Sequence, residues 1–598
     1  MADQQPTNPV PPPAEAPKTE PAATPAPAVP DGTLAGTPAP APGGEGATIS
    51  KKAAKKAEAK AKKEAEKARR AAELAAKQAA ANAAQSEDNA KENYGPESPE
   101  KQISPDAIEI HLKDIGEEHV GKTVELRAWL QNARMQGAKM VFVELREEGN
   151  WSIQGIATAS PEGNPVSRQM AKWIGSINPE SFVVVEGTVA KPAVPVKGCT
   201  VSNYELHITK CYLHAAAPAM LGMTLAAANR PITNFSDEEQ QASVEQKVEK
   251  LSISEPAGIP AASMLTHLDN IVMHKRSPLQ QAIADIRAEM KQLYREYLRS
   301  QGFKEFEPPC LIGAASEGGA NVFRLPYFDK EAYLAQSPQF YKQIEIAGGR
   351  KRVFSCGPVF RAENSNTPRH MTEFTGLDME MEIKKDYHEV LDVLENCLLY
   401  IFRNIKERCA KEIALVRSVY PCEEFLFPEP GKTVRLTFAE GQKLLREEGP
   451  EEFRNVRDDE DMTTPQEKAL GALVRKKYGT DFYTLDKFPE SARPFYAKED
   501  PANPKVTNAY DLFMRGQEIC SGGQRINDPV ELEARIRTKG IDPNSPGIKE
   551  YVDIFRQAGV PAHGGGGIGL DRVVAWYLNL PSVHLAAYYP RTPKRLLP

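Results

Sequence analysis

Apolar and polar residues alternate along several short segments between residues 108 and 214, a pattern typical of strands with one buried face. Val124, Leu126, Ala128 and Leu130 define the first segment. The elements expected after it are strands at 140–145 and 152–157, a helix at 166–174, and strands at 182–189 and 204–212. Three strands, a helix and two strands in this order predict an OB-fold β-barrel, a fold often used to hold single-stranded nucleic acid.

From residue 277 the pattern changes to an amphipathic helix that extends to about residue 300, followed by mixed strands and helices. We therefore expect a multidomain α+β protein. The expected divisions are a Pro/Ala-rich tail at 1–50, a Lys-rich helical extension and linker at 51–104, the barrel at 105–214, a connector at 215–276 and a large domain at 277–598.

Composition sets the N-terminal part of the chain apart. Residues 1–50 hold thirteen of the 49 prolines and no aromatic residue, so we expect this tail to be disordered. Residues 51–70 carry ten Lys or Arg against three Glu, a local charge of +7 on a chain whose net charge is −6. A basic block on an acidic chain favours contact with a polyanion, and a solvated helix without a partner is the alternative.

Two classes of protein are excluded by what the sequence lacks. It has no run of 18 apolar residues and no apolar signal segment at its start, so neither a membrane span nor secretion is expected. Its eight cysteines form no C-x₂-C pair, so we expect free thiols in a reducing compartment and no zinc ribbon.

Residues able to handle a nucleotide gather in the last domain, at 315–320, 336–342, 360–380, 516–525 and 564–573. Arg361 and Arg572 can bind phosphate oxygens bidentately, and Glu518 and Asp511 are hard oxygen ligands that suit Mg²⁺. The glycines at 564–567 would let backbone approach a ligand closely, although a tight structural turn explains them equally well, since the Walker lysine is missing.

Longer strings in this domain resemble a known family. Phe360–Glu363 with His370–Phe374 resembles motif 2 of the class II aminoacyl-tRNA synthetases, Gly566–Arg572 resembles motif 3, and Glu307-Pro308-Pro309 resembles the end of motif 1. Further strings resemble the eukaryotic cytosolic aspartyl-tRNA synthetases: Ser316–Gly319, Gln336–Lys342, Gly376–Asp378, Ser521–Arg525 and Pro593–Leu596. The resemblance covers residues 108 to 598.

This resemblance implies an antiparallel-sheet catalytic domain of the class II type, an anticodon-binding OB domain, a homodimer and a cytoplasmic location. The implied activity is that of an aspartate–tRNA ligase, which forms aspartyl-adenylate from L-aspartate and ATP with Mg²⁺ and transfers the aspartyl group to the 3′ end of tRNA(Asp).

The resemblance also implies roles for individual residues. The expected catalytic residues are Arg361, Arg572 and Glu518, and the expected metal ligands are Glu518 and Ser521. The ATP-binding set is Arg361, Ala362, Glu363, Arg369, His370, Met371, Phe374, Glu518, Gly569, Leu570, Asp571 and Arg572. The aspartate-binding set is Glu317, Gln339, Lys342, Arg361, Asp378, Ser521 and Arg525. The tRNA-binding set is Phe142, Arg134, Gln154, Lys51, Lys52, Lys55 and Lys56.

Some alternatives stay open at this point. Alternation alone does not exclude that Phe142 is a barrel core residue. Pro368, Glu147 and Glu148 depart from the family pattern at positions expected to meet tRNA. A paralogue that passes aspartate to another acceptor, a non-catalytic RNA-binding protein on the same scaffold, and an asparagine enzyme are therefore the competing hypotheses.

Overall fold

The computed structural model describes residues 88–232, 261–316, 321–365 and 367–597, together with Lys67, Arg69 and Arg70. The predicted disordered tail and nearly all of the Lys-rich extension lie outside these residues. Two units are separated, residues 1–87 and 88–598, and the description below concerns the second.

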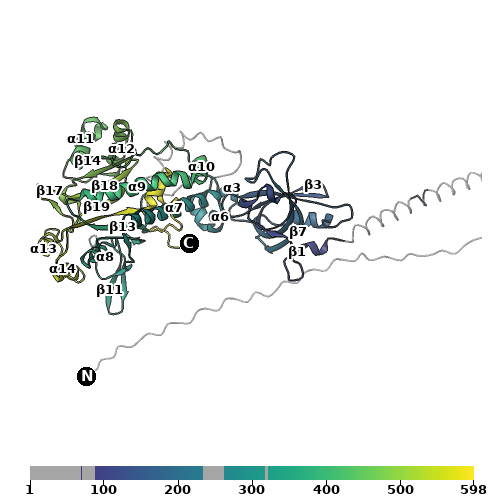
Figure 1. Ribbon diagram of the computed structural model, residues 1–598, viewed down its shortest axis with the longest axis horizontal. Coiled ribbons are helices and arrows are strands. Elements are labelled where there is room, and N and C mark those ends of the chain that lie inside the picture. The colour runs from purple at the N-terminus through teal and green to yellow at the C-terminus, as the bar shows by residue number, and fades with distance from the viewer. Residues whose placement is uncertain are drawn as a thin grey trace, which may run out of the picture. The chain divides into compact units, whose positions relative to one another are not determined.

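A closed barrel forms the first part of this unit (Figure 1). Its strands and helix are β3 (Thr123–Gln136), β4 (Met140–Arg146), β5 (Ser152–Thr158), α2 (Arg168–Ile174), β6 (Ser181–Ala190) and β7 (Glu205–Ala215). Strand β3 pairs with β4, β4 with β5, β5 with β7, β7 with β6, and β6 again with β3, so the circuit has no free edge. This confirms the predicted OB fold.

Residues 88–104 belong to the barrel and not to the linker expected from the sequence. Strand β1 (Tyr94–Pro96) pairs in parallel with β7, and the Tyr212 hydroxyl donates to the carbonyl of Glu92 at 2.8 Å. Ala90 is buried, and the Tyr94 ring lies 5.3 Å from that of Trp173. A strand of three residues shows no alternation, so only its pairing with a distant strand reveals it.

The second part is built on an eight-stranded sheet in the order β14-β15-β18-β19-β20-β13-β12-β8. The strands are β8 (Lys304–Glu305), β12 (Arg352–Phe360), β13 (Glu373–Glu382), β14 (Val434–Thr437), β15 (Phe482–Asp486), β18 (Ala509–Met514), β19 (Gln517–Gln524) and β20 (His563–Gly569). Its six central strands, β15 to β12, pair antiparallel, and only the two outermost pairings are parallel. The predicted antiparallel catalytic sheet is thus confirmed.

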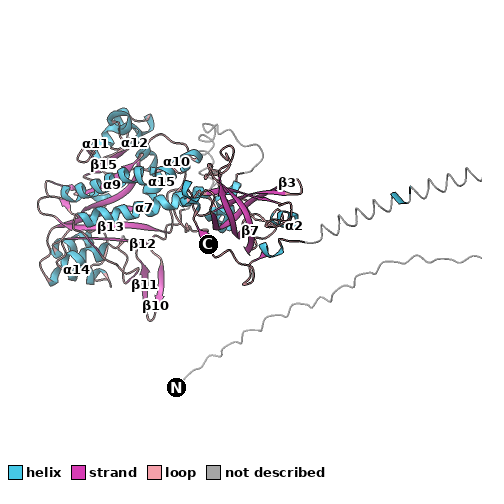
Figure 2. Cartoon of the chain, turned by 45° about the vertical axis from the view of Figure 1, so that its right-hand side comes forward, coloured by secondary structure: helices cyan, strands magenta, loops and turns pink. Residues whose placement is uncertain are grey.

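Helices cover one face of this sheet and leave the other for the site (Figure 2). They are α7 (Pro278–Ser300), α9 (His388–Arg408) and α15 (Leu570–Tyr577). Helix α7 begins where the sequence predicts, because the Ser277 hydroxyl accepts from the backbone N–H of Gln280 and Pro278 occupies the first turn. On β13, Leu377 and Met379 join the core beneath the helices, so Asp378 points to the opposite face.

Shorter elements complete the described part of the chain. The other helices are α3 (Leu225–Ala228), α5 (Met264–Asp269), α6 (Ile271–Arg276), α8 (Gln339–Ala347), α10 (Ala410–Val419), α11 (Phe438–Glu448), α12 (Thr464–Tyr478), α13 (Pro529–Thr538) and α14 (Ile548–Gln557). The other strands are β2 (Ile108–Glu109), β9 (Leu311–Ile312), β10 (Arg324–Tyr327), β11 (Lys330–Leu334), β16 (Glu499–Asp500) and β17 (Asn503–Thr507). Six 3₁₀ turns lie at Lys91–Asn93, Leu112–Asp114, Glu117–His119, Glu451–Phe453, Glu490–Ala492 and Val583–Leu585.

The glycines at 564–567 form a central strand, β20, and not the tight turn considered from the sequence. A Cβ atom on Gly565 would lie 2.0 Å from the carbonyl oxygen of Met379 and 2.2 Å from a carboxylate oxygen of Glu380. On Gly566 it would lie 2.8 Å from Leu394 of α9. Glycine is required here because neighbours occupy the space on both faces of the strand.

We expect Gly565→Ala to destabilise the catalytic part, because a methyl group at this position overlaps backbone as well as a buried carboxylate. Overpacking of this kind costs about 1–3 kcal/mol, and a clash with backbone belongs at the upper end. Urea-induced unfolding measures the loss. Gly559→Ala is the matched control, since a Cβ there meets no atom within 4 Å, and equal stability of the two variants would contradict the explanation.

Candidate functional site

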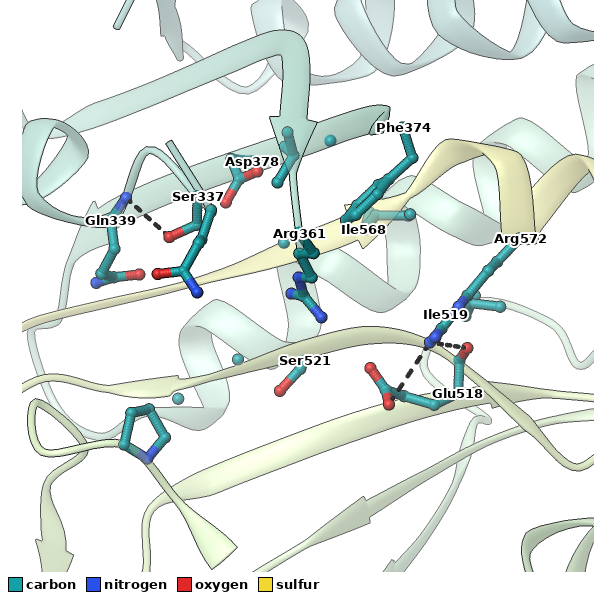
Figure 3. A pocket seen from close by; sticks show the side chains of 18 of the residues that line it. Ser337, Gln339, Arg361, Phe374, Asp378, Glu518, Ile519, Ser521, Ile568 and Arg572 are labelled. Atoms are coloured by element: carbon teal, nitrogen blue, oxygen red, sulfur yellow. Dashed lines mark hydrogen bonds and ion pairs between the residues drawn. The ribbon is translucent and has the colours of Figure 1, made fainter. Parts of the chain in front are cut away.

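A cavity of about 220 Å³ lies on the face of the sheet that the helices leave open (Figure 3). Residues from α8, β12, β13, β18, β19, β20 and α15 line it, so segments far apart in the sequence meet there. From the predicted sets, the lining contains Gln339, Lys342, Arg361, Glu363, Arg369, His370, Met371, Phe374, Asp378, Glu518, Ser521, Arg525, Gly569, Asp571 and Arg572.

The turn between β12 and β13 presents a cation beside an aromatic ring. The backbone N–H of Arg361 donates to the carbonyl of Thr372 at 3.0 Å and closes the turn. The guanidinium carbon of Arg361 lies 5.4 Å from the centroid of the Phe374 ring, and its side chain is 44% exposed. A planar ring next to an accessible guanidinium suits a ligand with an aromatic base and a phosphate.

A β-bulge brings Glu518 and Ser521 to the same face of the sheet. Leu512 of β18 faces Cys520, while the next residue, Phe513, faces Glu518, so Ile519 is the extra residue. In a regular strand, residues three apart point to opposite faces, and the bulge corrects this spacing.

Arg572 lies next to Glu518 at this end of the cavity. Its Nη1 donates to the backbone carbonyl of Glu518 at 3.2 Å and lies 3.7 Å from the carboxylate oxygen Oε2. Burial raises the pKa of Glu518, but the positive charges of Arg572, Arg493 and Arg361 more than offset this, and the pKa lies below its ordinary value. Glu518 is therefore an anion surrounded by cations.

Four buried charges lie at the other end of the cavity, three of them in its lining and Glu380 behind them. Lys342 Nζ lies 3.0 Å from Asp378 Oδ1 and 3.4 Å from Glu380 Oε2, and the Lys342 side chain is only 2% exposed. Arg525 Nε donates to Glu380 Oε1 at 3.0 Å, and its Nη2 donates to the carbonyl of Gly565 at 2.9 Å. Burial raises the pKa of Glu380, but Arg525 and Lys342 lower it below its ordinary value overall.

Two residues of this site, Glu380 and Arg493, are not predicted from the sequence. Glu380 has no role in the predicted sets, although it lies two residues after Asp378 on the same face of β13, and that spacing was the available signal. Arg493 lines the cavity, donates to Ser521 Oγ at 3.0 Å and binds Asp511 Oδ2 at 2.6 Å. No spacing in the sequence points to Arg493.

Some predicted residues lie elsewhere or are already engaged. Ala362 and Leu570 do not line the cavity, and Glu317 lies outside the described residues. Asp571 lines it, but its carboxylate lies 2.9 Å from Arg287 and accepts from the backbone N–H of Thr375 at 3.0 Å. Its assignment to ATP binding stays a prediction.

The donor set fits Mg²⁺ bound together with a phosphate ligand. No group of three or more His, Cys, Asp or Glu among the described residues is arranged to hold a metal alone. Mg²⁺ in nucleotide sites needs only one or two carboxylates, because phosphates and water supply the other ligands. Glu518 and Ser521 line the cavity, and Asp511 Oδ1 behind them is buried without a hydrogen-bond partner. Burial and the charge of Glu518 raise the pKa of Asp511 to about 6, against the pull of Arg493.

Phe142 lies on the outer face of the barrel and not in its core. Its neighbours Val141 and Val143 are buried, whereas Phe142 itself is half-buried. The guanidinium carbon of Arg134, directly opposite on β3, lies 5.7 Å from the Phe142 ring centroid. Gln154 lies on the same face of the neighbouring strand, where its Nε2 donates to Glu205 at 3.1 Å. The four predicted lysines at 51–56 lie outside the described residues.

Two of the unusual residues in this chain have structural partners. The carboxylate of Glu147 accepts from the backbone N–H of Leu112 at 2.6 Å, and its side chain is 13% exposed. The carbonyl of Pro368 accepts from the backbone N–H of Val583 at 2.8 Å.

The helices of the described part of the chain are all too short or too polar to cross a bilayer.

Comparison with known proteins shows the family. The model of the tRNA synthetases class II (D, K and N) matches residues 263–593. The cytoplasmic aspartate–tRNA ligase of Rattus norvegicus is 43% identical over 514 residues, which are 86% of this chain and 96% of the relative. A solved structure of the aspartyl-tRNA synthetase from Entamoeba histolytica superimposes with a TM-score of 0.72 at 36% identity, covering 85% of this chain and 96% of the other. A solved structure of the asparaginyl-tRNA synthetase from Pyrococcus horikoshii, bound to asparaginyl-adenylate, superimposes with a TM-score of 0.66 at 29% identity. It covers 82% of this chain and 99% of the other. This chain therefore belongs to the class II tRNA synthetases, in the family of the aspartate–tRNA ligases.

Proposed function

We propose that the chain activates L-aspartate with ATP and transfers the aspartyl group from aspartyl-adenylate to the 3′ end of tRNA(Asp). One observation carries this proposal: a single cavity joins an arginine-and-aromatic end, at Arg361, Phe374 and Arg572, to an end that buries the cations Lys342 and Arg525. The first end suits a nucleoside triphosphate, and the second end suits a small carboxylate.

Aspartate is favoured over asparagine because the cations at the second end are buried. The side chains of Lys342 and Arg525 are 2% and 6% exposed, so water cannot solvate them well. A carboxylate entering beside them gains two charge-assisted contacts, whereas the NH₂ group of a carboxamide would face these donors and could accept from neither. Asp378 balances Lys342 and offers an acceptor for the ammonium group of the substrate.

The proposed reaction needs no protein nucleophile. The α-carboxylate of aspartate attacks the α-phosphorus of ATP in line, the bond to the pyrophosphate oxygen breaks, and aspartyl-adenylate and pyrophosphate form. Arg361 stabilises the charge on the α-phosphate and Arg572 holds the γ-phosphate, while Phe374 stacks on adenine. Glu518 and Ser521 would hold Mg²⁺, which would supply further charge neutralisation for the phosphates. The terminal ribose hydroxyl of tRNA then attacks the adenylate carbonyl and releases AMP.

We further propose a cytoplasmic homodimer whose barrel, residues 105–214 of the expected division, binds the anticodon. The motif 1 resemblance at 307–309 supports dimerisation, since motif 1 is the dimer-forming element of the family. The exposed face around Phe142 supports anticodon binding. We also propose that the catalytic domain begins at about residue 277, and the cap of α7 at Ser277 supports this boundary.

Aspartate-dependent ATP–pyrophosphate exchange, followed by aspartylation of purified tRNA, tests the whole proposal. Exchange and charging together would support it. Exchange without charging would favour the paralogue with another acceptor, and a folded protein without exchange would favour the non-catalytic hypothesis. Asparagine added in competition separates the asparagine enzyme from the aspartate enzyme.

We expect Arg361→Ala to lower the rate of aspartate-dependent exchange by about 10²-fold to 10³-fold, the range for loss of one group that stabilises transition-state charge. Binding of tRNA should survive, because the barrel is unchanged. Arg350→Ala is the matched control: this arginine pairs with Glu345 at 2.8 Å at a half-exposed position outside the cavity. Normal exchange in Arg361→Ala would contradict the site assignment.

A carboxylate with a raised pKa supports Arg369 from behind the cavity. Glu467 Oε2 accepts from Arg369 Nη2 at 3.0 Å, and its side chain is 12% exposed. Burial, aided by the negative charge of Glu518, raises the pKa of Glu467 to about 7 although Arg369 opposes the shift. The folded chain thus holds this proton up to a higher pH than the unfolded chain, whose glutamate titrates near 4.5.

This difference predicts a pH dependence that Glu467→Gln removes. As pH rises from about 5 to about 7.5, the parent's free energy of unfolding should fall by about 2 kcal/mol relative to the variant. The free energy of unfolding falls with rising pH because Glu467 loses its proton at a lower pH in the unfolded state than in the folded state. Urea unfolding of both proteins across this range measures the change, and parallel pH profiles would overturn the prediction.

We expect Phe142→Ala to weaken tRNA binding by about tenfold, because one stacked base is worth about 1–3 kcal/mol. Filter binding at fixed salt measures the affinity. Aspartate-dependent exchange without tRNA is the internal control and should not change. Unaltered tRNA affinity would remove Phe142 from the proposed interface.

A further inference from the structure

A chain of buried hydrogen bonds lies behind the aspartate end of the cavity. It starts at the backbone carbonyl of Pro561, which lies 2.8 Å from His563 Nδ1. His563 Nε2 lies 2.8 Å from Gln343 Nε2, and Gln343 Oε1 lies 2.9 Å from Gln339 Nε2. Gln339 and Gln343 are one turn apart on α8, and His563 and Gln343 have no measurable exposure.

The direction of every hydrogen bond in this series follows from the first acceptor, the carbonyl of Pro561. A carbonyl oxygen only accepts, so His563 Nδ1 must carry the hydrogen. In a neutral imidazole the other nitrogen then accepts, and the carboxamide of Gln343 must present its NH₂ group to it. The oxygen of Gln343 therefore faces Gln339, which donates to it through its own NH₂ group.

Tyr551 and the burial of His563 strengthen this orientation. The Tyr551 hydroxyl donates to Gln343 Oε1 at 2.8 Å, so turning the Gln343 amide would break two bonds to its oxygen. Burial lowers the pKa of His563 against the pull of Glu380, and Arg525 adds to the lowering, so the imidazole stays neutral. The Phe555 ring stacks on the imidazole with centroids 6.2 Å apart.

We propose that Gln343 and His563 are positioning residues that orient the carboxamide of Gln339 with its oxygen toward the substrate. Gln339 lines the cavity in the same region as Ser337 and Asp378 (Figure 3). With its NH₂ group committed to Gln343, Gln339 offers an acceptor, and the matching donor is the ammonium group of an amino acid. This inference rests on the proposed function, since it assigns part of the aspartate subsite.

We call this series of hydrogen bonds, from Pro561 through His563 and Gln343 to Gln339, the relay. It favours a substrate that donates a hydrogen bond to Gln339. An amide turned by half a rotation would present hydrogen atoms to the ammonium group and repel it. Because the relay holds the amide in one orientation, aspartate binding does not have to select it. Loss of the relay should therefore weaken aspartate binding while leaving ATP binding unchanged.

Gln343→Met tests the relay, since methionine fills a similar volume, has no donor for His563 and offers Gln339 only a weak sulfur acceptor. We expect the KM for aspartate in ATP–pyrophosphate exchange to rise by about tenfold, the effect of losing one hydrogen bond to a charged group, here the ammonium of the substrate. The KM for ATP and the kcat should stay within about twofold. Tyr551→Phe is the matched control, because it removes the other donor to Gln343 Oε1 and leaves the bond from Gln339 in place.

The outcomes separate this inference from the proposed function. A folded parent without aspartate-dependent exchange would overturn the proposed function. Suppose instead that the parent shows exchange and that the aspartate KM is the same in Gln343→Met and Tyr551→Phe. This result would overturn the relay alone, and so would a Gln343→Met variant whose KM for ATP rises as much as its KM for aspartate. If Gln343→Met does not fold, the double variant His563→Leu/Tyr551→Phe decides, because it removes both neighbours that fix the Gln343 amide. An aspartate KM at least about threefold above that of Tyr551→Phe supports the relay, and an equal value overturns it.

Discussion

The mutual neutralisation of four buried charges is the constraint on which the rest of the catalytic part depends. Lys342, Asp378, Glu380 and Arg525 come from three separate elements, α8, β13 and the residue after β19. Removing one partner of such a group leaves an uncompensated charge in a poorly hydrated place, which costs several kcal/mol. The sheet must therefore bring α8 and β13 together before this end of the cavity can exist.

Strand β20 is the place where that constraint meets the backbone. It lies between β13 and β19, so the carboxylate of Glu380 reaches across it to Arg525, and any side chain at Gly565 would occupy the path. The same narrow strand begins with His563, whose imidazole supports the amides of α8 from behind. Charge balance, close packing and amide orientation are thus three aspects of one arrangement.

Patterns local in sequence predicted much of this molecule. The barrel strands follow from alternation, α7 follows from periodicity and its Ser-Pro start, and most site residues lie in strings that resemble the family. Features that depend on pairing between distant strands were not predictable. Strand β1 exists because it pairs with β7, and Glu518 shares a face with Ser521 because Ile519 bulges against β18. Arg493 belongs to no motif, and its role follows only from its place beside Asp511.

The crowding around β20 also has a genetic consequence. Glycine is the smallest residue, so every missense change in the codons for 564–567 adds atoms to a strand whose surroundings are already filled. At Gly565 and Gly566 the obstacles are neighbouring backbone or the core side of α9, which cannot move aside cheaply. Missense variation in this gene should therefore be absent from these codons even where the neighbouring exposed positions vary freely.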